Sequence, residues 1–306
     1  MPSELEFVCG CAAYADLFFC VKAQPNASQA IAKGGFPFSF HGFDEQEDEK
    51  WVRYTRVFNW PAQAVASFKP GGGDRVVVAL GPHGEVYEIQ TTDSSESTSV
   101  IPGSPRFLGR NLAVANETAF ALGMGRCIAR WDGPQTWTRI DPDLPADDDK
   151  ATGFNDLVVA SPGEMYTLGW SGEIFRTDGV RWQAVDSPVS AALRAACVGA
   201  DGLVYAAGYD GTMIRGRGDD WSIIETDRKG VFLDICTLGQ DVFVSTAFEV
   251  FKLTEGGLVA VSEFADPDDR PRSCTGLSAA TDGSCVFWMG GSDLFRFDGA
   301  LWQRVV

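Results

Sequence analysis

Histidine is scarce in this chain, and its scarcity removes the usual general base from most of the molecule. Only two of the 306 residues are histidines, His41 and His83, and neither lies near a nucleophile-elbow pattern. We expect both to be turn or surface residues. The run Gly71–Asp74 lacks the Lys-Ser/Thr ending of a phosphate-binding loop and indicates a hairpin connection instead. The sequence therefore predicts no catalytic residue and no cofactor, and favours a protein that is not an enzyme.

Positive charge is also in short supply. The chain has 25 Lys and Arg against 42 Asp and Glu, which gives a formal net charge of −17. Such a protein repels phosphate backbones, so the charge disfavours a nucleic-acid partner and favours a basic protein partner. The alternative is that the acidity only keeps the protein soluble.

Long apolar runs and a secretory signal are missing as well. The N-terminus, MPSELEF, has neither a basic region nor an apolar region after it, and no later run is long enough to cross a bilayer. We therefore expect a cytoplasmic protein with no membrane partner.

Metal-ligand spacing is absent from the cysteines. Of the eight, Cys9 and Cys11 lie two residues apart on one strand face, and no second pair completes a zinc site. Reduced thiols packed in the core are the expected state. The aspartates between Asp141 and Asp149 lack the alternating oxygens and central glycine of a calcium loop. No metal site is predicted.

A repeat organises what the sequence does contain. In four copies an arginine precedes a tryptophan by six or seven residues, and three of these copies have Asp-Gly between the two. The tryptophans are Trp137, Trp182, Trp221 and Trp302, spaced 45, 39 and 81 residues apart. The last interval is about two propeller blades long, and a degenerate copy ending at Leu258 fills it. A still weaker copy begins at Val86, and Trp51 fits the outer strand of a first copy. That makes seven copies.

Each copy is predicted to form four short strands. In the fifth copy, strands are expected over 194–198, 203–207, 212–215 and 221–225, separated by turn residues. The second strand often ends in glycine, which we interpret as a turn position that needs a positive φ. These glycines are Gly81, Gly123, Gly169 and Gly290.

The fold class follows from this pattern. A four-stranded blade cannot bury both its faces alone, whereas seven blades packed radially can. The chain is predicted to be all-β, a single seven-bladed β-propeller of four-stranded antiparallel blades over 1–306. The blades are expected at about 4–57, 62–103, 107–142, 153–188, 191–227, 231–265 and 273–306. The repeated tryptophans should pack outer strands against neighbouring blades.

The Asp-Gly-x-x-Trp turn resembles the bacterial WD40/YVTN/BNR-like repeat group, and it is loosely similar to the Asp-box of sialidase-type propellers. Asp178 to Trp182 is one residue shorter than the Asp-box, and Thr177 replaces its leading serine. The resemblance implies the propeller fold and carries no catalytic residue over. Lone propellers of this repeat type occur beside polymorphic toxins, so it also implies an immunity protein.

One face of the propeller is the predicted binding surface. Turns between second and third strands share that face with the links between blades, and together they carry aromatic side chains surrounded by carboxylates, as many protein interfaces do. The predicted partner-binding residues are Trp60, Asp147, Asp148, Asp149, Trp170, Tyr209, Phe248, Asp266, Asp268 and Asp269. The alternative for Trp170 and Tyr209 is that they only cover the channel mouth. The acidic run Asp44–Glu49 should lie on the opposite face as a solvated loop.

Three functions are compatible with this surface. The first is an immunity protein that binds and neutralises a basic cognate protein, possibly a toxin domain. The second is a scaffold or assembly factor for a multi-subunit complex. The third is a carbohydrate-active enzyme that uses carboxylates of Asp141–Asp149 or Asp266–Asp269, although two catalytic carboxyls would need a defined separation across a groove.

Overall fold

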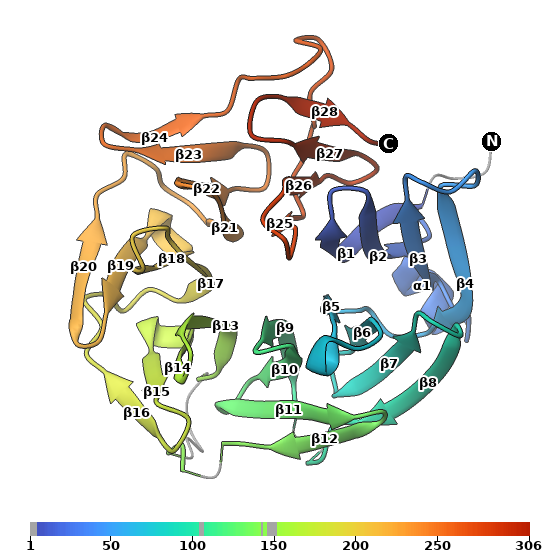
Figure 1. The fold of residues 1–306 in the computed structure, drawn as a ribbon, viewed down its shortest axis with the longest axis horizontal. Helices are drawn as coiled ribbons and strands as arrows, with labels where there is room; N and C mark the ends of the chain where they lie inside the picture. Colours follow the sequence, from blue (N-terminus) through green and yellow to red (C-terminus); the bar gives the residue numbers. More distant parts are fainter. Residues whose placement is uncertain (1–4, 104–106, 142, 146–151) are drawn as a thin grey trace.

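The computed structural model describes residues 5–103, 107–141, 143–145 and 152–306 and confirms the predicted all-β class. Seven sheets of four antiparallel strands surround a central axis, and each sheet is made of four strands consecutive in the sequence (Figure 1). Blade one also carries the short helix α1 (Ala27–Ala32) between its second and third strands. Among the described residues, the first and last blades each have four strands of their own and share none.

The strands of the first four blades are β1 (Glu6–Tyr14), β2 (Leu17–Ala23), β3 (Phe38–Asp44) and β4 (Trp51–Phe58); β5 (Ala64–Phe68), β6 (Val76–Leu80), β7 (Glu85–Gln90) and β8 (Ser95–Val100); β9 (Gly109–Ala115), β10 (Thr118–Gly123), β11 (Cys127–Gly133) and β12 (Thr136–Arg139); and β13 (Phe154–Ser161), β14 (Glu164–Gly169), β15 (Ile174–Thr177) and β16 (Trp182–Val185).

The strands of the last three blades are β17 (Leu193–Val198), β18 (Val204–Gly208), β19 (Met213–Arg217) and β20 (Asp220–Ile224); β21 (Asp234–Leu238), β22 (Asp241–Ser245), β23 (Val250–Thr254) and β24 (Gly257–Ala260); and β25 (Gly276–Ala279), β26 (Val286–Met289), β27 (Leu294–Phe297) and β28 (Trp302–Arg304).

The hydrophobic core lies between the blades. The second strand of each blade is covered on both faces, and β6, with the sequence VVVAL, is buried along its whole length. A continuous apolar run suits such a strand because both its faces pack against neighbouring sheets. Seven clusters of buried side chains fill the interfaces, and each joins residues of adjacent blades.

The repeated tryptophans lie on outer strands and pack against the preceding blade. The indole N–H of Trp182 donates to the carbonyl of Ile140, 3.2 Å away in the segment that follows blade three. Trp221 in blade five packs edge-on to Tyr166 in blade four, with ring centroids 5.7 Å apart. This arrangement packs an aromatic side chain between adjacent blades and explains why tryptophan recurs at about one blade length.

The Asp-Gly positions form turns between third and fourth strands. The Asp178 carboxylate accepts the N–H of Val180 at 3.0 Å, and Gly179 has φ +91°. In blade seven, Asp298 accepts the N–H groups of Ala300 and Leu301 at 2.9 Å. An aspartate that bonds to the backbone two residues on, next to a glycine with positive φ, is ordinary turn chemistry.

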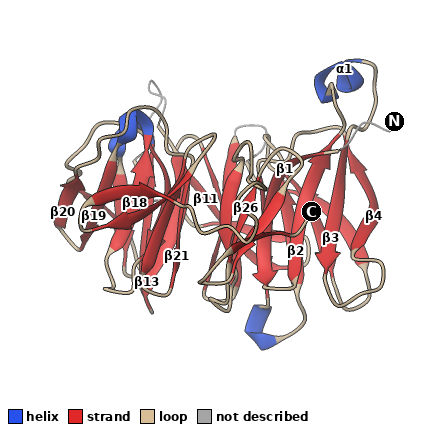
Figure 2. Ribbon diagram, turned by 90° about the horizontal axis from the view of Figure 1, so that it is seen from above, coloured by secondary structure: helices blue, strands red, loops and turns tan. Residues whose placement is uncertain are grey.

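Two faces result from this topology (Figure 2). The turns between second and third strands, such as 170–172 and 209–211, lie on the same side as the links between blades, such as 59–63; we call this side the link face. Helix α1 also lies there, and the turns between first and second strands lie on the opposite face. No helix among the described residues is long and apolar enough to cross a membrane.

Candidate functional site: the mouth of the central channel

The inner strands enclose a channel with a hollow of about 530 Å³. Its wall includes residues of all seven first strands, with small side chains such as Ala12, Ala66 and Ala195 along much of its length. Every first strand begins at the link face, so its first residues surround the mouth of the channel there. The site is therefore assembled from separate blades that each contribute one or two residues.

An aromatic pair lies at this mouth. Trp170 and Tyr209 occupy equivalent positions in the turns that follow β14 and β18, and their ring centroids are 6.4 Å apart. Both side chains are partly buried and line the channel. The backbone N–H of Trp170 donates to Gly153, and that of Tyr209 donates to Ala192, so each turn is held to the link that precedes its own blade.

The glycines that end these second strands do not have a positive φ, which corrects the sequence interpretation; at Gly169 the requirement is space. Gly81, Gly123, Gly169 and Gly290 are not among the residues with positive φ. A Cβ at Gly169 would overlap the carbonyl oxygen of Gly153, because the link runs directly against it. Positive φ occurs two and three residues later, at +57° in Ser171 and +71° in Gly172.

Two arginines line the same channel as the aromatic pair. Arg110 is the second residue of β9, and Arg194 is the second residue of β17. Both are exposed and line the channel. Asn155 takes the same place in β13 between them, and its amide donates to the carbonyl of Leu193 at 2.7 Å. The guanidinium of Arg110 lies 5.7 Å from the Trp170 ring centroid, within the range of a cation–π contact.

Two carboxyls sit deeper in the wall and join adjacent blades. Asp156 accepts the N–H of Ala196 in the next blade at 2.8 Å, and Asp234 accepts that of Leu277 at 2.9 Å. Burial raises the pKa of Asp156 to about 7 and that of Asp234 to about 6, although these backbone donors oppose the shift. Because both oxygens of each carboxyl accept backbone N–H groups, we assign them a structural role.

Two further predicted aromatic residues lie on the same face. Trp60, in the link between blades one and two, stacks on Phe58 with ring centroids 4.4 Å apart. Phe248 follows β22, and its side chain is 70% exposed. Trp170 and Tyr209 contact each other, whereas Trp60 contacts Phe58 of blade one. Phe248 lies in blade six, next to the blade that carries Tyr209.

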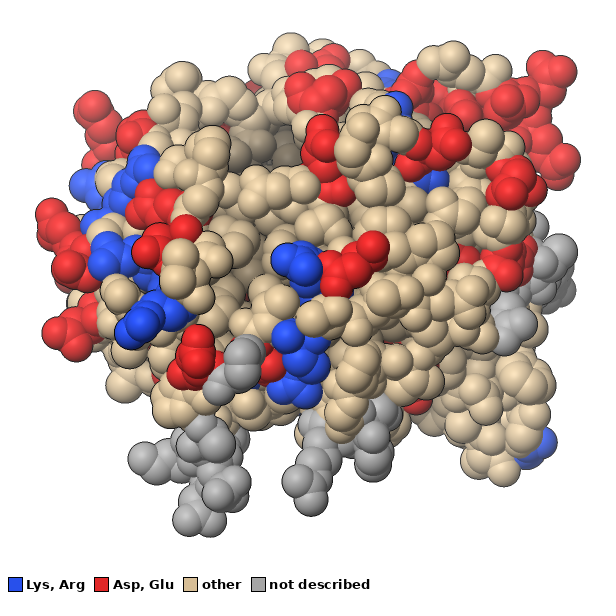
Figure 3. Space-filling view, turned by 60° about the horizontal axis from the view of Figure 1, so that its bottom comes forward, with Lys and Arg blue, Asp and Glu red and all other residues tan. Residues whose placement is uncertain are grey.

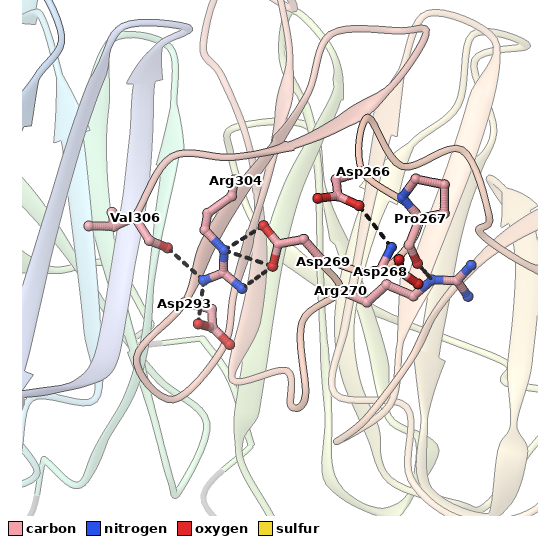
Figure 4. A network of polar contacts seen from close by, with 8 residues as sticks. All are labelled: Asp266, Pro267, Asp268, Asp269, Arg270, Asp293, Arg304 and Val306. Atoms are coloured by element: carbon pink, nitrogen blue, oxygen red, sulfur yellow. Dashed lines mark hydrogen bonds and ion pairs between the residues drawn. The ribbon is translucent and has the colours of Figure 1, made fainter.

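The acidic link between blades six and seven contains three of the predicted residues (Figure 4). Asp269 accepts two hydrogen bonds from Arg304 Nε at 2.8 and 2.9 Å, and this arginine also pairs with Asp293 at 2.5 Å. Asp266 accepts the backbone N–H of Asp268 at 3.0 Å. Asp269 thus fastens the link to β28 (Figure 4), while Asp268 is exposed.

Other charged positions fall elsewhere. Asp147, Asp148 and Asp149 lie outside the described residues. The run Asp44–Glu49 spans the end of β3 and the turn to β4, on the opposite face as predicted, and lines a cleft of about 750 Å³ between blades one and two. Figure 3 shows acidic and basic side chains interspersed along the part of the outer rim that it displays.

The remaining titratable groups offer little for catalysis. His41 is buried in β3 and shares a 2.8 Å hydrogen bond with Ser39, so its predicted turn or surface position is wrong. Burial raises the pKa of the Cys9 and Cys11 thiols far above the usual value, which keeps both protonated and unreactive. Within the described ranges, no three His, Cys, Asp or Glu side chains gather as metal ligands would.

Sequence reasoning did not single out Arg110 and Arg194. They are 84 positions apart and share no motif, and only the closed ring brings their strands to one mouth. The available signal was that each is the second residue of a strand segment, after Gly109 and Leu193, on the side that faces the axis.

Comparisons with known proteins support the fold and point to a relative. No family model matches the chain. It is 36% identical over 237 residues to a curated Pseudomonas aeruginosa protein named "Immune protein Tsi7", and the match covers 74% of each chain. Among solved structures, it resembles the WD40 propeller domain of Doa1 (TM-score 0.66, 10% identity, 97% and 93% of the chains covered). It also resembles YCF48 bound to D1 peptide (TM-score 0.67, 15% identity, 97% and 94% covered).

Proposed function

Because the chain belongs to the family of the Immune protein Tsi7 of Pseudomonas aeruginosa, we propose that it is an immunity protein that binds a protein partner and blocks its action. The observation that carries this proposal is the 36% identity over 237 residues. Similarity over three-quarters of a propeller includes most of the blades and thus most of both faces. The protein would act by binding alone, with no catalytic step of its own.

The fold suits this role. A propeller presents many turns on a rigid frame, so a binding surface can vary while the blades keep their packing. YCF48, one of the structurally similar propellers, is bound to a peptide in its solved structure. Because the aromatic side chains gather there, we place the partner of this protein on the link face, over Trp170 and Tyr209, with Phe248 and Asp268 at its margin. Aromatic anchors with a charged rim are common at such surfaces.

The partner is proposed to be basic. A net charge of −17 attracts a cationic protein over a distance of about 10 Å and raises its association rate, an effect that salt screens. We further propose a cytoplasmic location, where the eight unpaired cysteines would stay reduced.

The test is capture of the partner from native lysate by the tagged protein, at low and at moderate salt, with the bound proteins identified by mass. We expect one basic protein, held less tightly at moderate salt, whose activity disappears when the propeller is added. Capture of several subunits of one complex would replace the proposal with the scaffold hypothesis. Capture of nothing at low salt would overturn it and direct attention to glycans.

A further inference from the structure

The mouth of the channel holds two arginines that form no ion pair with the described residues. Across blades three, four and five, the channel-facing positions at the start of the inner strands are Arg110, Asn155 and Arg194. Among the described residues, no carboxylate oxygen comes within the 4.0 Å of an ion pair with either guanidinium. The chain has 42 acidic and 25 basic residues, so most arginines have carboxylates available to pair with. Two arginines that lack a carboxylate partner at the same opening therefore suggest a ligand.

A second donor at the mouth also lacks an acceptor. The indole Nε1 of Trp170 is buried and has no hydrogen-bond partner among the described residues. An unsatisfied buried donor destabilises the protein, and a hydrogen bond to a bound ligand would remove that cost. The ring itself contacts Arg110 on one side and Tyr209 on another, so its position is fixed before any ligand arrives.

The buried carboxyls inside the channel compete little with a ligand for the guanidinium groups of Arg110 and Arg194. Arg194 lies near enough to Asp234 to lower the pKa of that carboxyl, but both Asp234 oxygens accept backbone N–H groups of Ile235 and Leu277. Asp156 is likewise engaged by Leu157 and Ala196. These carboxyls therefore leave the hydrogen-bond donors of the two guanidinium groups available.

We propose that this mouth binds a carboxylate on an acidic segment of the protein partner, with Arg110 and Arg194 as donors and the Trp170–Tyr209 pair against the aliphatic part of the segment. The inference rests on the proposed function, in which the partner is a polypeptide. Guanidinium groups suit carboxylates because they donate two parallel hydrogen bonds. The partner would be basic overall and acidic at this one point, which would fix its orientation on the propeller.

An acidic probe makes the test selective, because a protein of charge −17 repels acidic peptides everywhere except at a local basic site. The probe is the capped peptide Gly-Glu-Gly-Glu-Gly, and the matched control peptide has glutamine in place of glutamate. Binding is followed through the indole ¹H–¹⁵N signals of the labelled protein, with the Trp170 signal assigned from Trp170→Phe. We expect the glutamate peptide to shift the Trp170 signal and the glutamine peptide to leave it unchanged.

Variants then locate the site. Arg110→Ala with Arg194→Ala should weaken binding of the glutamate peptide by at least about tenfold. Arg181→Ala removes one positive charge, half of what the double variant removes, from an exposed turn on the opposite face, and should change affinity less than about twofold. Unchanged thermal midpoints would exclude a folding defect. Equal binding of the two peptides, no shift with either, or equal losses in both arginine variants would each overturn the proposal.

Failure of this inference can be told apart from failure of the proposed function. If lysate capture yields a neutralised partner and the double arginine variant binds it unchanged, the immunity function stands and the carboxylate site is wrong. If no partner is captured and the glutamate peptide still binds at Trp170, the site stands and the immunity function is wrong.

Discussion

At the scale of single residues, the link face depends on glycines that allow two backbone segments to touch. Gly169 has φ −176°, which any residue can adopt, so its constraint is the carbonyl of Gly153 against its Cα. Gly208 meets Ala192 in the same way one blade later. The aromatic pair at the channel mouth is positioned by these contacts, because Trp170 and Tyr209 are the next residues in the chain.

Replacing one of these glycines should damage both stability and the mouth. For Gly169→Ala we expect a loss of about 3 kcal/mol or more in the free energy of unfolding, because the new methyl group must push the link away. Gly256→Ala is the matched control, since its Cβ would meet only Thr254 Oγ1 at 3.8 Å. Urea denaturation measures both. A stable Gly169→Ala protein with unchanged Trp170 signals would contradict the close-contact explanation.

Asp156 gives the protein a pH dependence of known sign. Burial raises its folded pKa to about 7, above the value near 3.9 expected in the unfolded chain. The folded state therefore holds a proton that the unfolded state has lost, and stability falls as the pH rises from about 4 through 7, by at most about 1.4 kcal/mol per pH unit.

The variant Asp156→Asn should remove this slope. Asparagine stays neutral, so unfolding measured in urea from pH 5 to pH 8 should change less with pH than in the unmodified protein. The variant should also be less stable at pH 5, because its amide cannot accept both backbone N–H groups. Asp186→Asn, at an exposed carboxylate, should keep the original slope. Identical slopes in all three proteins would show that Asp156 titrates normally.

At the scale of elements, the link between blades six and seven depends on one arginine. Arg304 of β28 holds Asp269 of the link and Asp293 of the β26–β27 turn, and these two carboxylates raise the pKa of the arginine (Figure 4). The pair lowers the pKa of Asp269 in turn, so its contribution is present at neutral pH and is lost as acid protonates the carboxylate.

Loosening this link should expose it to protease. In Asp269→Asn we expect faster tryptic cleavage after Arg272, because the link is released from Arg304 while the blades stay folded. Asp268→Asn is the control, since the side chain of Asp268 is exposed and only its backbone N–H bonds within the turn. Cleavage rates that match in the two variants would remove the structural role assigned to Asp269. Reduced partner binding in Asp268→Asn alone would support the predicted rim residue.

The elements were predictable to different degrees. Trp182 and Trp221 revealed their blades because each packs against the preceding blade at the same place in its outer strand. Leu258, buried in β24, was found by spacing alone. Helix α1 gave no signal in a six-residue stretch without a side-chain cap. The arginine pair was missed because the direction of Arg110 and Arg194 toward the axis depends on how the ring closes, which no local pattern encodes.

At the scale of the whole molecule, the ring closes with no strand shared between blades one and seven in the described part of the chain. Blades one and seven meet through Phe7 N–H to the carbonyl of Gly291 at 2.7 Å, through Phe18 against Phe287 at 5.0 Å, and through Arg296. Arg296 reaches the carbonyl of Ala15 at 2.7 Å and the carboxylate of Glu45 at 2.5 Å. Every other pair of adjacent blades is also joined by the chain itself, so this interface alone depends on side chains and a few backbone hydrogen bonds.

The closure should therefore respond to a change that other interfaces tolerate. Arg296→Met is expected to speed hydrogen exchange in β1, β2 and β27 without affecting blades three to five, because the two end blades separate while the rest stays folded. Arg217→Met is the matched control, since Arg217 pairs with Glu164 across blades four and five at 2.6 Å, where the chain continues from one blade to the next. Separation there leaves the blades tethered and quick to return. If exchange rises equally at both interfaces, chain continuity has no bearing on local opening, and the closure is no weaker than any other contact in the ring.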